Sequence, residues 1–352
     1  MLRGLLIFWL ALSLLGRPAL ADEPSVDQLI EAGHYKRARA KLSSAGQPAN
    51  AADADRLSRI ALAFGELDRA FQLSERATSL APKNARYRVQ LAMAAGARAM
   101  RAGLFKAVSL GRRMKEELEK ALDLDEKNVE ALSTLVLFHL KAPGFLGAHP
   151  EEAREIAAEL QRLNPMRGFL AQAQIAREDK KLNQLEGLYR KAAEAAPQDY
   201  VAQVAAASGF GSLNNYAGEE QYARAAVAID PTRAAGHARL AEALAGSHRW
   251  AELDEALAEA ERNVPDNYLP NFAVGVLLLN QGQELARAEA CLRKYLSQEP
   301  EGGTPSRAIG RWRLGQALEK LGRKREAMSE LEAALKEQPD LKEAKKDLER
   351  LK

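Results

Sequence analysis

The sequence offers few residues that could perform nucleophilic, acid–base or metal chemistry. No two of its five histidines stand four residues apart, the helical spacing that directs two imidazoles at one metal ion. The only cysteine, Cys291, follows Ala290 and precedes Leu292, so we interpret it as a small buried side chain. Neither a phosphate-binding glycine loop nor a nucleophile elbow is present. We expect no catalytic centre, no metal, no cofactor, and solvated or turn histidines at His34, His139, His149, His237 and His248.

Most of the chain is instead a repeated pattern of packing residues. Pro197, Pro231 and Pro265 follow one another at intervals of 34 residues. Between such prolines, small and large apolar residues recur in a fixed order. The last copy contains Leu314, Gly315, Leu318, Gly322, Ala327, Leu331, Ala334 and Pro339.

This pattern predicts pairs of short helices. Alanines let two helices approach closely, large residues fill the space between them, and glycine and proline mark the turns. Two short helices cannot bury a core alone, so neighbouring units must share one. Strand-like alternation of β-branched residues is nearly absent, and we predict an all-α fold.

The order of these residues resembles that of the tetratricopeptide repeat family. The unit before the last one contains Val274, Gly275, Leu278, Gly282, Ala288, Leu292, Tyr295 and Pro300, and the match covers most of residues 26–340. The unit that ends at Pro197 is short, and Ala206 and Ala207 replace the Leu-Gly pair in the next. The resemblance implies an α-solenoid over residues 22–340, a right-handed superhelix of about eight to nine units. Residues 341–352 are expected to form a capping helix.

The first 21 residues have the layout of a cleavable signal peptide. Arg3 precedes an apolar run from Leu5 to Leu15, and small residues stand at Ala19 and Ala21. The run is shorter than the roughly 20 residues that span a membrane. We predict cleavage after Ala21, a periplasmic or secreted protein, and no membrane span after processing. An uncleaved anchor is the open alternative.

The overall charge argues against a nucleic-acid partner. Removal of Arg3 and Arg17 leaves 49 basic against 48 acidic residues. Proteins that bind polyanions usually show a clear basic excess or stripe.

One helical segment, residues 266–282, is apolar on all sides. Such a helix is expected to be covered on both sides. By the family resemblance, the side that faces away from its own unit lines the concave surface, and the next unit continues that line. We hypothesise that these residues form a partner-binding groove: Leu269, Phe272, Val276, Leu279, Ile309, Trp312 and Gln316. The alternative is that the superhelix curls enough for its own helices to cover them.

Two units exceed the period, and their extra residues are expected in lengthened turns near 97–113 and 142–150. Equivalent turns of adjacent repeats lie on one edge of a solenoid, and insertions there often mark a binding side. We expect the apolar residues of the two turns to pack on one another within a basic rim. This secondary edge site comprises Leu104, Phe105, Val108, Phe145, Leu146, Arg112 and Arg113. A local cap that only stiffens the stack is the alternative.

A third long turn, residues 297–307, contains Gly302, Gly303 and Pro305, which suggest a flexible joint. The ordinary tolerance of loops for extra residues is the alternative.

These features predict a non-catalytic scaffold in the bacterial envelope that binds a protein or peptide segment in its groove. The alternative is a carrier that encloses a small hydrophobic ligand within a tightly curled superhelix. A homo-oligomer is compatible with either.

Overall fold

The computed structural model describes residues 23–42 and 48–352, and within these ranges it is a stack of helix pairs without a strand. The prediction of an all-α solenoid is confirmed. The predicted signal peptide lies outside the described residues. The pairs are α1 (Val26–Ala32) with α2 (Tyr35–Leu42), α3 (Ala51–Ala63) with α4 (Leu67–Leu80), α5 (Ala85–Ala99) with α6 (Leu104–Leu124), α7 (Val129–Lys141) with α8 (Pro150–Leu163), α9 (Pro165–Glu178) with α10 (Leu185–Ala195), α11 (Tyr200–Gly211) with α12 (Tyr216–Ile229), α13 (Ala234–Gly246) with α14 (Trp250–Asn263), α15 (Leu269–Gln281) with α16 (Leu285–Leu296), and α17 (Arg307–Lys320) with α18 (Lys324–Glu337).

The repeated glycines allow the two helices of a pair to touch. A Cβ on Gly275 would lie 2.8 Å from Cγ of Leu292, and one on Gly315 would lie 3.0 Å from Cγ of Leu331. Any larger side chain would separate the helices at these points. The turn that follows needs a left-handed residue, and Gly322 has a φ of 77° there.

The core runs continuously from pair to pair. One cluster of buried residues extends from α9 to α16, and alanines such as Ala173, Ala223 and Ala288 have no exposed surface within it. At the C-terminal end, α19 (Lys342–Leu351) lies over α17 and α18 and buries Ala344, Leu348 and Leu351. No helix of residues 23–42 and 48–352 is both long and apolar enough to cross a membrane.

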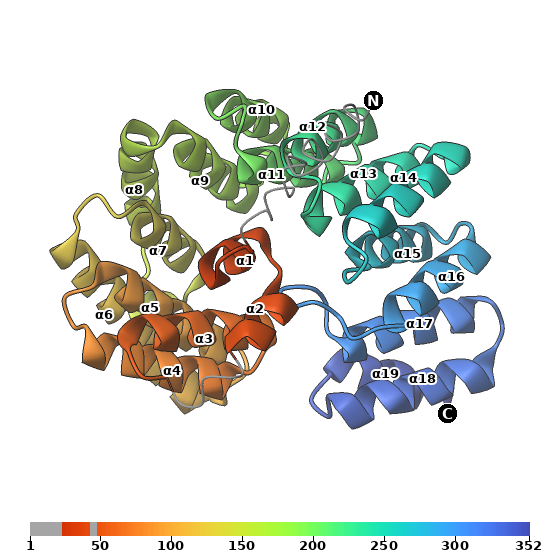
Figure 1. Cartoon of the computed structure of the whole chain (residues 1–352), viewed down its shortest axis with the longest axis horizontal. Coiled ribbons are helices and arrows are strands. Elements are labelled where there is room, and N and C mark those ends of the chain that lie inside the picture. The colour runs from red at the N-terminus through yellow and green to blue at the C-terminus, as the bar shows by residue number, and fades with distance from the viewer. Residues whose placement is uncertain (1–22, 43–47) are drawn as a thin grey trace, which may run out of the picture.

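The stack curls until its first pair meets the loop between α16 and α17 (Figure 1). The backbone N–H of Lys36 donates to Oε1 of Glu301 at 2.8 Å. The N–H of Gly303 donates to the carbonyl oxygen of Ala63 at 2.8 Å. Glu301 is only 3% exposed, and burial raises the pKa of its carboxyl group. The prediction of a flexible joint at 297–307 was therefore wrong, because this loop is packed against the N-terminal helices.

The two long units gain their extra length in different ways. The extra residues near 97–113 mostly lengthen α6, which has 21 residues, and the turn before it is short. The extra residues of 142–150 form a real turn, which contains the 3-10 helix η2 (Gly144–Leu146). The expectation of a lengthened turn near 97–113 was therefore wrong. The extra residues there continue a helix, which pairs their backbone N–H and C=O groups.

Candidate functional site

Of the seven residues predicted to line an inner groove, one is buried and six are partly exposed. Leu279 is 2% exposed and belongs to the core shared by α15 to α19. Phe272, Val276 and Trp312 are partly buried against the same core. Leu269 packs on a small cluster between α13 and α14. Ile309 and Gln316 are also of intermediate exposure. The groove stays a prediction, and adjoining helices cover part of its apolar lining.

Trp312 is held in place by the capping helix. Its indole Nε1 donates to Oδ2 of Asp347 at 2.8 Å, and Nε2 of Gln316 donates to the same oxygen at 2.8 Å. Burial opposes ionisation of Asp347, but hydrogen bonds from Trp312, Gln316 and Arg350 outweigh it and lower the carboxyl pKa. These hydrogen bonds therefore hold the side chain of Trp312 between α17 and α19.

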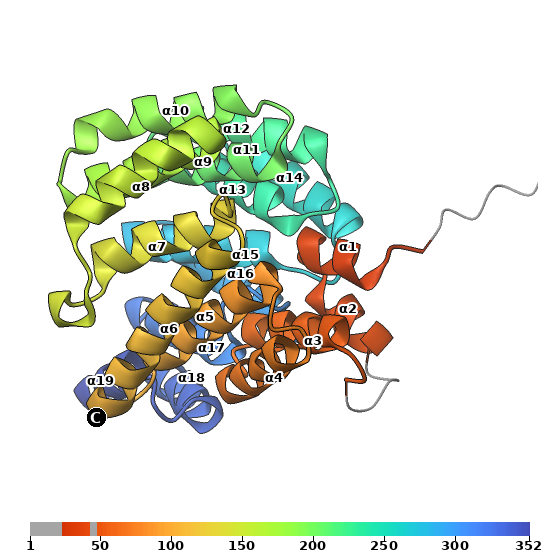
Figure 2. The same ribbon diagram turned by 90° about the vertical axis from the view of Figure 1, so that its left-hand side faces the viewer.

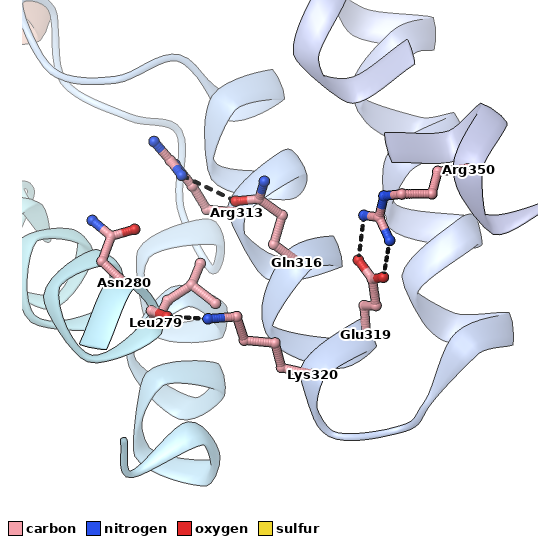
Figure 3. A pocket seen from close by; sticks show the side chains of 7 residues that line it. All are labelled: Leu279, Asn280, Arg313, Gln316, Glu319, Lys320 and Arg350. Carbon is pink, nitrogen blue, oxygen red and sulfur yellow. Dashed lines mark hydrogen bonds and ion pairs between the residues drawn. The ribbon is translucent and has the colours of Figure 1, made fainter. Parts of the chain in front are cut away.

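An opening of about 500 Å³ lies beside Trp312. Residues of α15, α17 and α19 line it (Figure 3). Two of its residues are occupied by contacts across the opening: Lys320 Nζ donates to the carbonyl oxygen of Leu279 at 2.8 Å, and Arg350 pairs with Glu319. The opening is lined by Leu279, Asn280, Arg313, Gln316, Glu319, Lys320 and Arg350.

Arg313 is the available cation of this opening. It donates to Oε1 of Gln316 at 3.0 Å and lies over the ring of Trp312, 4.0 Å from the centroid. Within the described part of the chain it forms no ion pair, whereas Arg350 and Lys320 are engaged. Burial lowers the pKa of the Arg313 guanidinium. The charges of Asp347 and Glu343 act on the guanidinium in the opposite direction without forming an ion pair with it. A partly buried guanidinium of this kind is stabilised by an anion that reaches it.

The predicted edge residues lie at the surface. Leu104 is 73% exposed, Phe105 is 91% exposed and Phe145 is 65% exposed. The expectation that Leu104 and Phe105 pack against the second turn is therefore wrong, because α6 carries them beyond it. Val108 is partly buried and, with Phe105, Arg112 and Arg113, lines a shallow opening of about 340 Å³.

The two long units are neighbours, as predicted, but their contact is made by other residues. A Cβ on Gly111 would lie 2.8 Å from Cδ1 of Leu146, so the leucine packs directly on α6 at this glycine. Lys115 Nζ donates to the carbonyl oxygen of Gly147 at 3.1 Å. Figure 2 shows α6, α7 and α8 on the side that faces the viewer.

Two histidines contradict the expectation that all five are solvated or in turns. His139 is 3% exposed, its Nδ1 accepts the backbone N–H of His149 at 3.1 Å, and its Nε2 lies 3.1 Å from Glu152. Burial lowers the pKa of His139. His237 is 2% exposed, and its Nε2 is 2.9 Å from the carbonyl oxygen of Pro231. Both rings hold turns in place, which helical spacing does not reveal.

The sequence interpretation also missed buried charges on the inner helices. Asp55 is 2% exposed, pairs with Arg86 at 3.3 Å and leaves Oδ1 without a hydrogen bond. It lines an opening of about 270 Å³ with Arg59 and Gln90. Asp55 and Arg59 are four residues apart on α3, on its inner side, and this spacing was the available signal.

Cys291 is buried, as predicted, and burial raises its thiol pKa to about 11. Among residues 23–42 and 48–352, no group of three or more histidine, cysteine, aspartate or glutamate side chains is placed to hold a metal.

Comparison with known proteins gives one family. Residues 310–341 match the family model of the tetratricopeptide repeat. No protein of curated function matches the chain by sequence.

Solved structures with a similar course of helices have low sequence identity. The APC/C hetero-tetramer Cut9-Hcn1 is 13% identical, with 93% of this chain and 75% of that chain covered and a TM-score of 0.43. Yeast Tom70 is 14% identical, with 93% and 86% covered and a TM-score of 0.47. A thermophilic tetratricopeptide repeat protein of Thermus thermophilus is 20% identical, with 57% and 97% covered and a TM-score of 0.38. Sequence identities and TM-scores this low give no information about the binding partners of this chain.

Proposed function

We propose that this chain, whose residues 310–341 match the tetratricopeptide repeat model, is a scaffold whose inner face binds an acidic segment of another protein. Repeats of this family typically mediate contacts between proteins and are generally non-catalytic. Their stacked first helices present a continuous surface, on which an extended or helical segment can lie.

The observation that carries the proposal is Arg313 in the opening of Figure 3. The guanidinium is partly buried and forms no ion pair among the described residues, although Asp347 and Glu343 act on its charge, while Asn280 of the same opening is exposed. Arginine binds carboxylates through two parallel N–H donors, and this geometry favours an aspartate, a glutamate or a terminal carboxylate. The half-buried apolar residues around it would support the rest of the segment.

We further propose that the protein acts in the bacterial envelope. The support is the signal-like layout of residues 1–21. A fusion of these residues to a reporter that is active only outside the cytoplasm tests this part separately from binding.

The carrier of a small hydrophobic ligand has weaker support. The openings beside Arg313 and beside Asp55 are lined mainly by charged and amide side chains, and such groups disfavour an apolar occupant.

The experiment compares in-cell crosslinking partners of the wild-type protein, Arg313→Glu and Arg325→Glu. Arg325 is an exposed residue of α18, so Arg325→Glu makes the same charge change on the outer side of the same repeat. We expect a partner that is captured by wild type and Arg325→Glu and lost with Arg313→Glu. A peptide copied from the crosslinked segment should then bind Arg313→Glu about 10- to 100-fold more weakly than wild type.

Both variants must give the circular dichroism and melting temperature of wild type. If the same partners are captured by all three proteins, or if the crosslinked segment has no carboxylate near the crosslink, the inner-face proposal is wrong.

A further inference from the structure

The four most exposed large apolar side chains of the described residues lie in two neighbouring turns. They are Phe105 at 91%, Met100 at 89%, Leu104 at 73% and Phe145 at 65%, and every other large apolar residue is at most 54% exposed. The first three come from the start of α6 and the turn before it, and the fourth comes from η2. We call this set the apolar edge. Exposed apolar side chains on two adjoining elements indicate an interaction surface.

The apolar edge is held by ordered contacts. Leu146 packs on α6 at Gly111, and Lys115 bonds the carbonyl oxygen of Gly147. His139 accepts the N–H of His149 at the end of the same turn. The side chains of the edge are therefore presented by a helix and a fixed turn.

The run of sequence that carries the first three of these side chains has charges of one sign. Residues 76–115 contain no aspartate or glutamate, although the whole chain is almost balanced. The basic residues of this run are Arg76, Lys83, Arg86, Arg88, Arg98, Arg101, Lys106, Arg112, Arg113 and Lys115.

Half of these cations are neutralised by carboxylates from outside the run. Arg86 pairs with Asp55, Arg98 pairs with Asp68, and Lys115 pairs with Glu119. Arg88 and Arg113 share Glu117.

The three cations next to the apolar edge are different. Arg101, Lys106 and Arg112 are exposed, and none forms an ion pair within the described part of the chain. Glu116 is the acidic residue that shares a shallow opening with Phe105 and Arg112. Exposed apolar side chains beside free cations favour a partner that is both apolar and anionic.

We propose that the apolar edge docks on the surface of a bilayer that contains anionic lipids. The four side chains stand out from the surface, each at least 65% exposed, and do not line a deep groove. A protein partner would need a complementary pocket for each of them, whereas lipid packs around protruding side chains without one. Aromatic and leucine side chains enter the boundary between headgroups and acyl chains, and arginine and lysine are attracted to anionic headgroups. This surface is separate from the inner face, so the proposal does not depend on the proposed function.

The test uses the full chain and a local reporter, because residues 1–21 are themselves apolar. An environment-sensitive dye is attached at Phe105→Cys, and a second protein carries it at Leu182→Cys, which replaces a 54% exposed residue in a different turn. Cys291 is buried and serves as the unlabelled background. The probes are vesicles of phosphatidylcholine alone and vesicles with 30% phosphatidylglycerol.

We expect the dye at position 105 to shift to the blue with the anionic vesicles and to stay unchanged with phosphatidylcholine, while the dye at position 182 stays unchanged with both. The combined variant Arg101→Gln, Lys106→Gln, Arg112→Gln should weaken the response at position 105 at least tenfold, as should 0.5 M salt.

Three results would overturn the proposal. The first is an equal shift at positions 105 and 182, which would mean attachment through another segment. The second is no shift, or an equal shift with both vesicles. The third is a shift with an 18-residue amphipathic peptide of leucine and glutamate but not with anionic vesicles, which would make the occupant an acidic protein helix.

Discussion

The inner face near α17 and the apolar edge near α6 carry similar residues and differ in what covers them. Phe272 contacts Tyr295 at a ring-centroid distance of 4.9 Å, and Trp312 is bonded to α19. Phe105 and Leu104 face solvent. Both regions follow the same repeat pattern, so the pattern alone does not separate core from surface. Which residues are buried depends on how the helices are placed. On the inner side the curl of the stack brings helices together, whereas on the edge the longer α6 extends past its neighbours.

The charged residues of the two regions also differ in how far protein contacts occupy them. In the opening of Figure 3, Lys320 and Arg350 are engaged with protein atoms, and Arg313 is the cation that forms no ion pair among the described residues. On the edge, Arg101, Lys106 and Arg112 are all available among the described residues. A single available cation suits a single carboxylate, whereas several dispersed cations suit a charged surface.

The sharpest test of this contrast is a pair of leucine truncations. We expect Leu279→Ala to lower the free energy of unfolding by about 2–5 kcal/mol, because it leaves a cavity in the shared core. Leu104→Ala should change it by less than about 0.5 kcal/mol. Urea titrations followed by circular dichroism measure both. Similar losses in the two variants would mean that the edge is covered in solution.

The repeat and the pairing of helices could be predicted from the sequence, because Gly275, Gly315 and their leucine partners act within one unit. Closure of the superhelix could not be predicted. The contact of Lys36 with Glu301 joins residues that lie 265 positions apart, and it depends on small rotations added over all units. For the same reason the sequence provided no means to decide how far the residues predicted for the inner face are covered.

The hydrogen bonds of Asp347 provide a second test of the covered region. Asp347→Ala removes the acceptor for Trp312 and Gln316, and we expect a loss of about 2 kcal/mol at pH 7. The folded-state pKa of Asp347 is below its ordinary value of 3.8, so its contribution is present above that pH and is lost as the pH falls through the folded pKa. The difference between wild type and variant should therefore shrink below pH 4. A difference that stays constant down to pH 2 would contradict this assignment.

The turn of the edge that His139 holds should lose stability at a higher pH than the inner face does. His139 has a folded pKa below its ordinary value of 6.5, so the unfolded chain takes up a proton first and stability falls as the pH drops below 6.5. Glu152, Lys115, His149 and Glu119 are the titratable groups that act on the ring. Protonation of Nδ1 also removes the acceptor for His149, a loss of about 1 kcal/mol.

Amide hydrogen exchange at residues 144–149 measures this effect. Protection should decrease between pH 7.5 and 5.5, after correction for the intrinsic rate, and should be independent of pH in His139→Gln. An equal pH dependence in both proteins would assign the change to another group.

The smallest expected effect concerns the contact that joins the two halves of the edge. Gly111→Ala should raise helix propensity, but its Cβ would crowd Cδ1 of Leu146, so the two terms oppose each other and the net change in stability should be within about 1 kcal/mol. The displaced leucine should move η2, and with it Phe145, away from α6. Anionic-vesicle binding should then weaken in Gly111→Ala and recover in Gly111→Ala, Leu146→Ala, where the smaller side chain makes room. If Gly111→Ala binds the vesicles as wild type does, Phe145 does not act together with the residues of α6, and the edge reduces to Met100, Leu104 and Phe105.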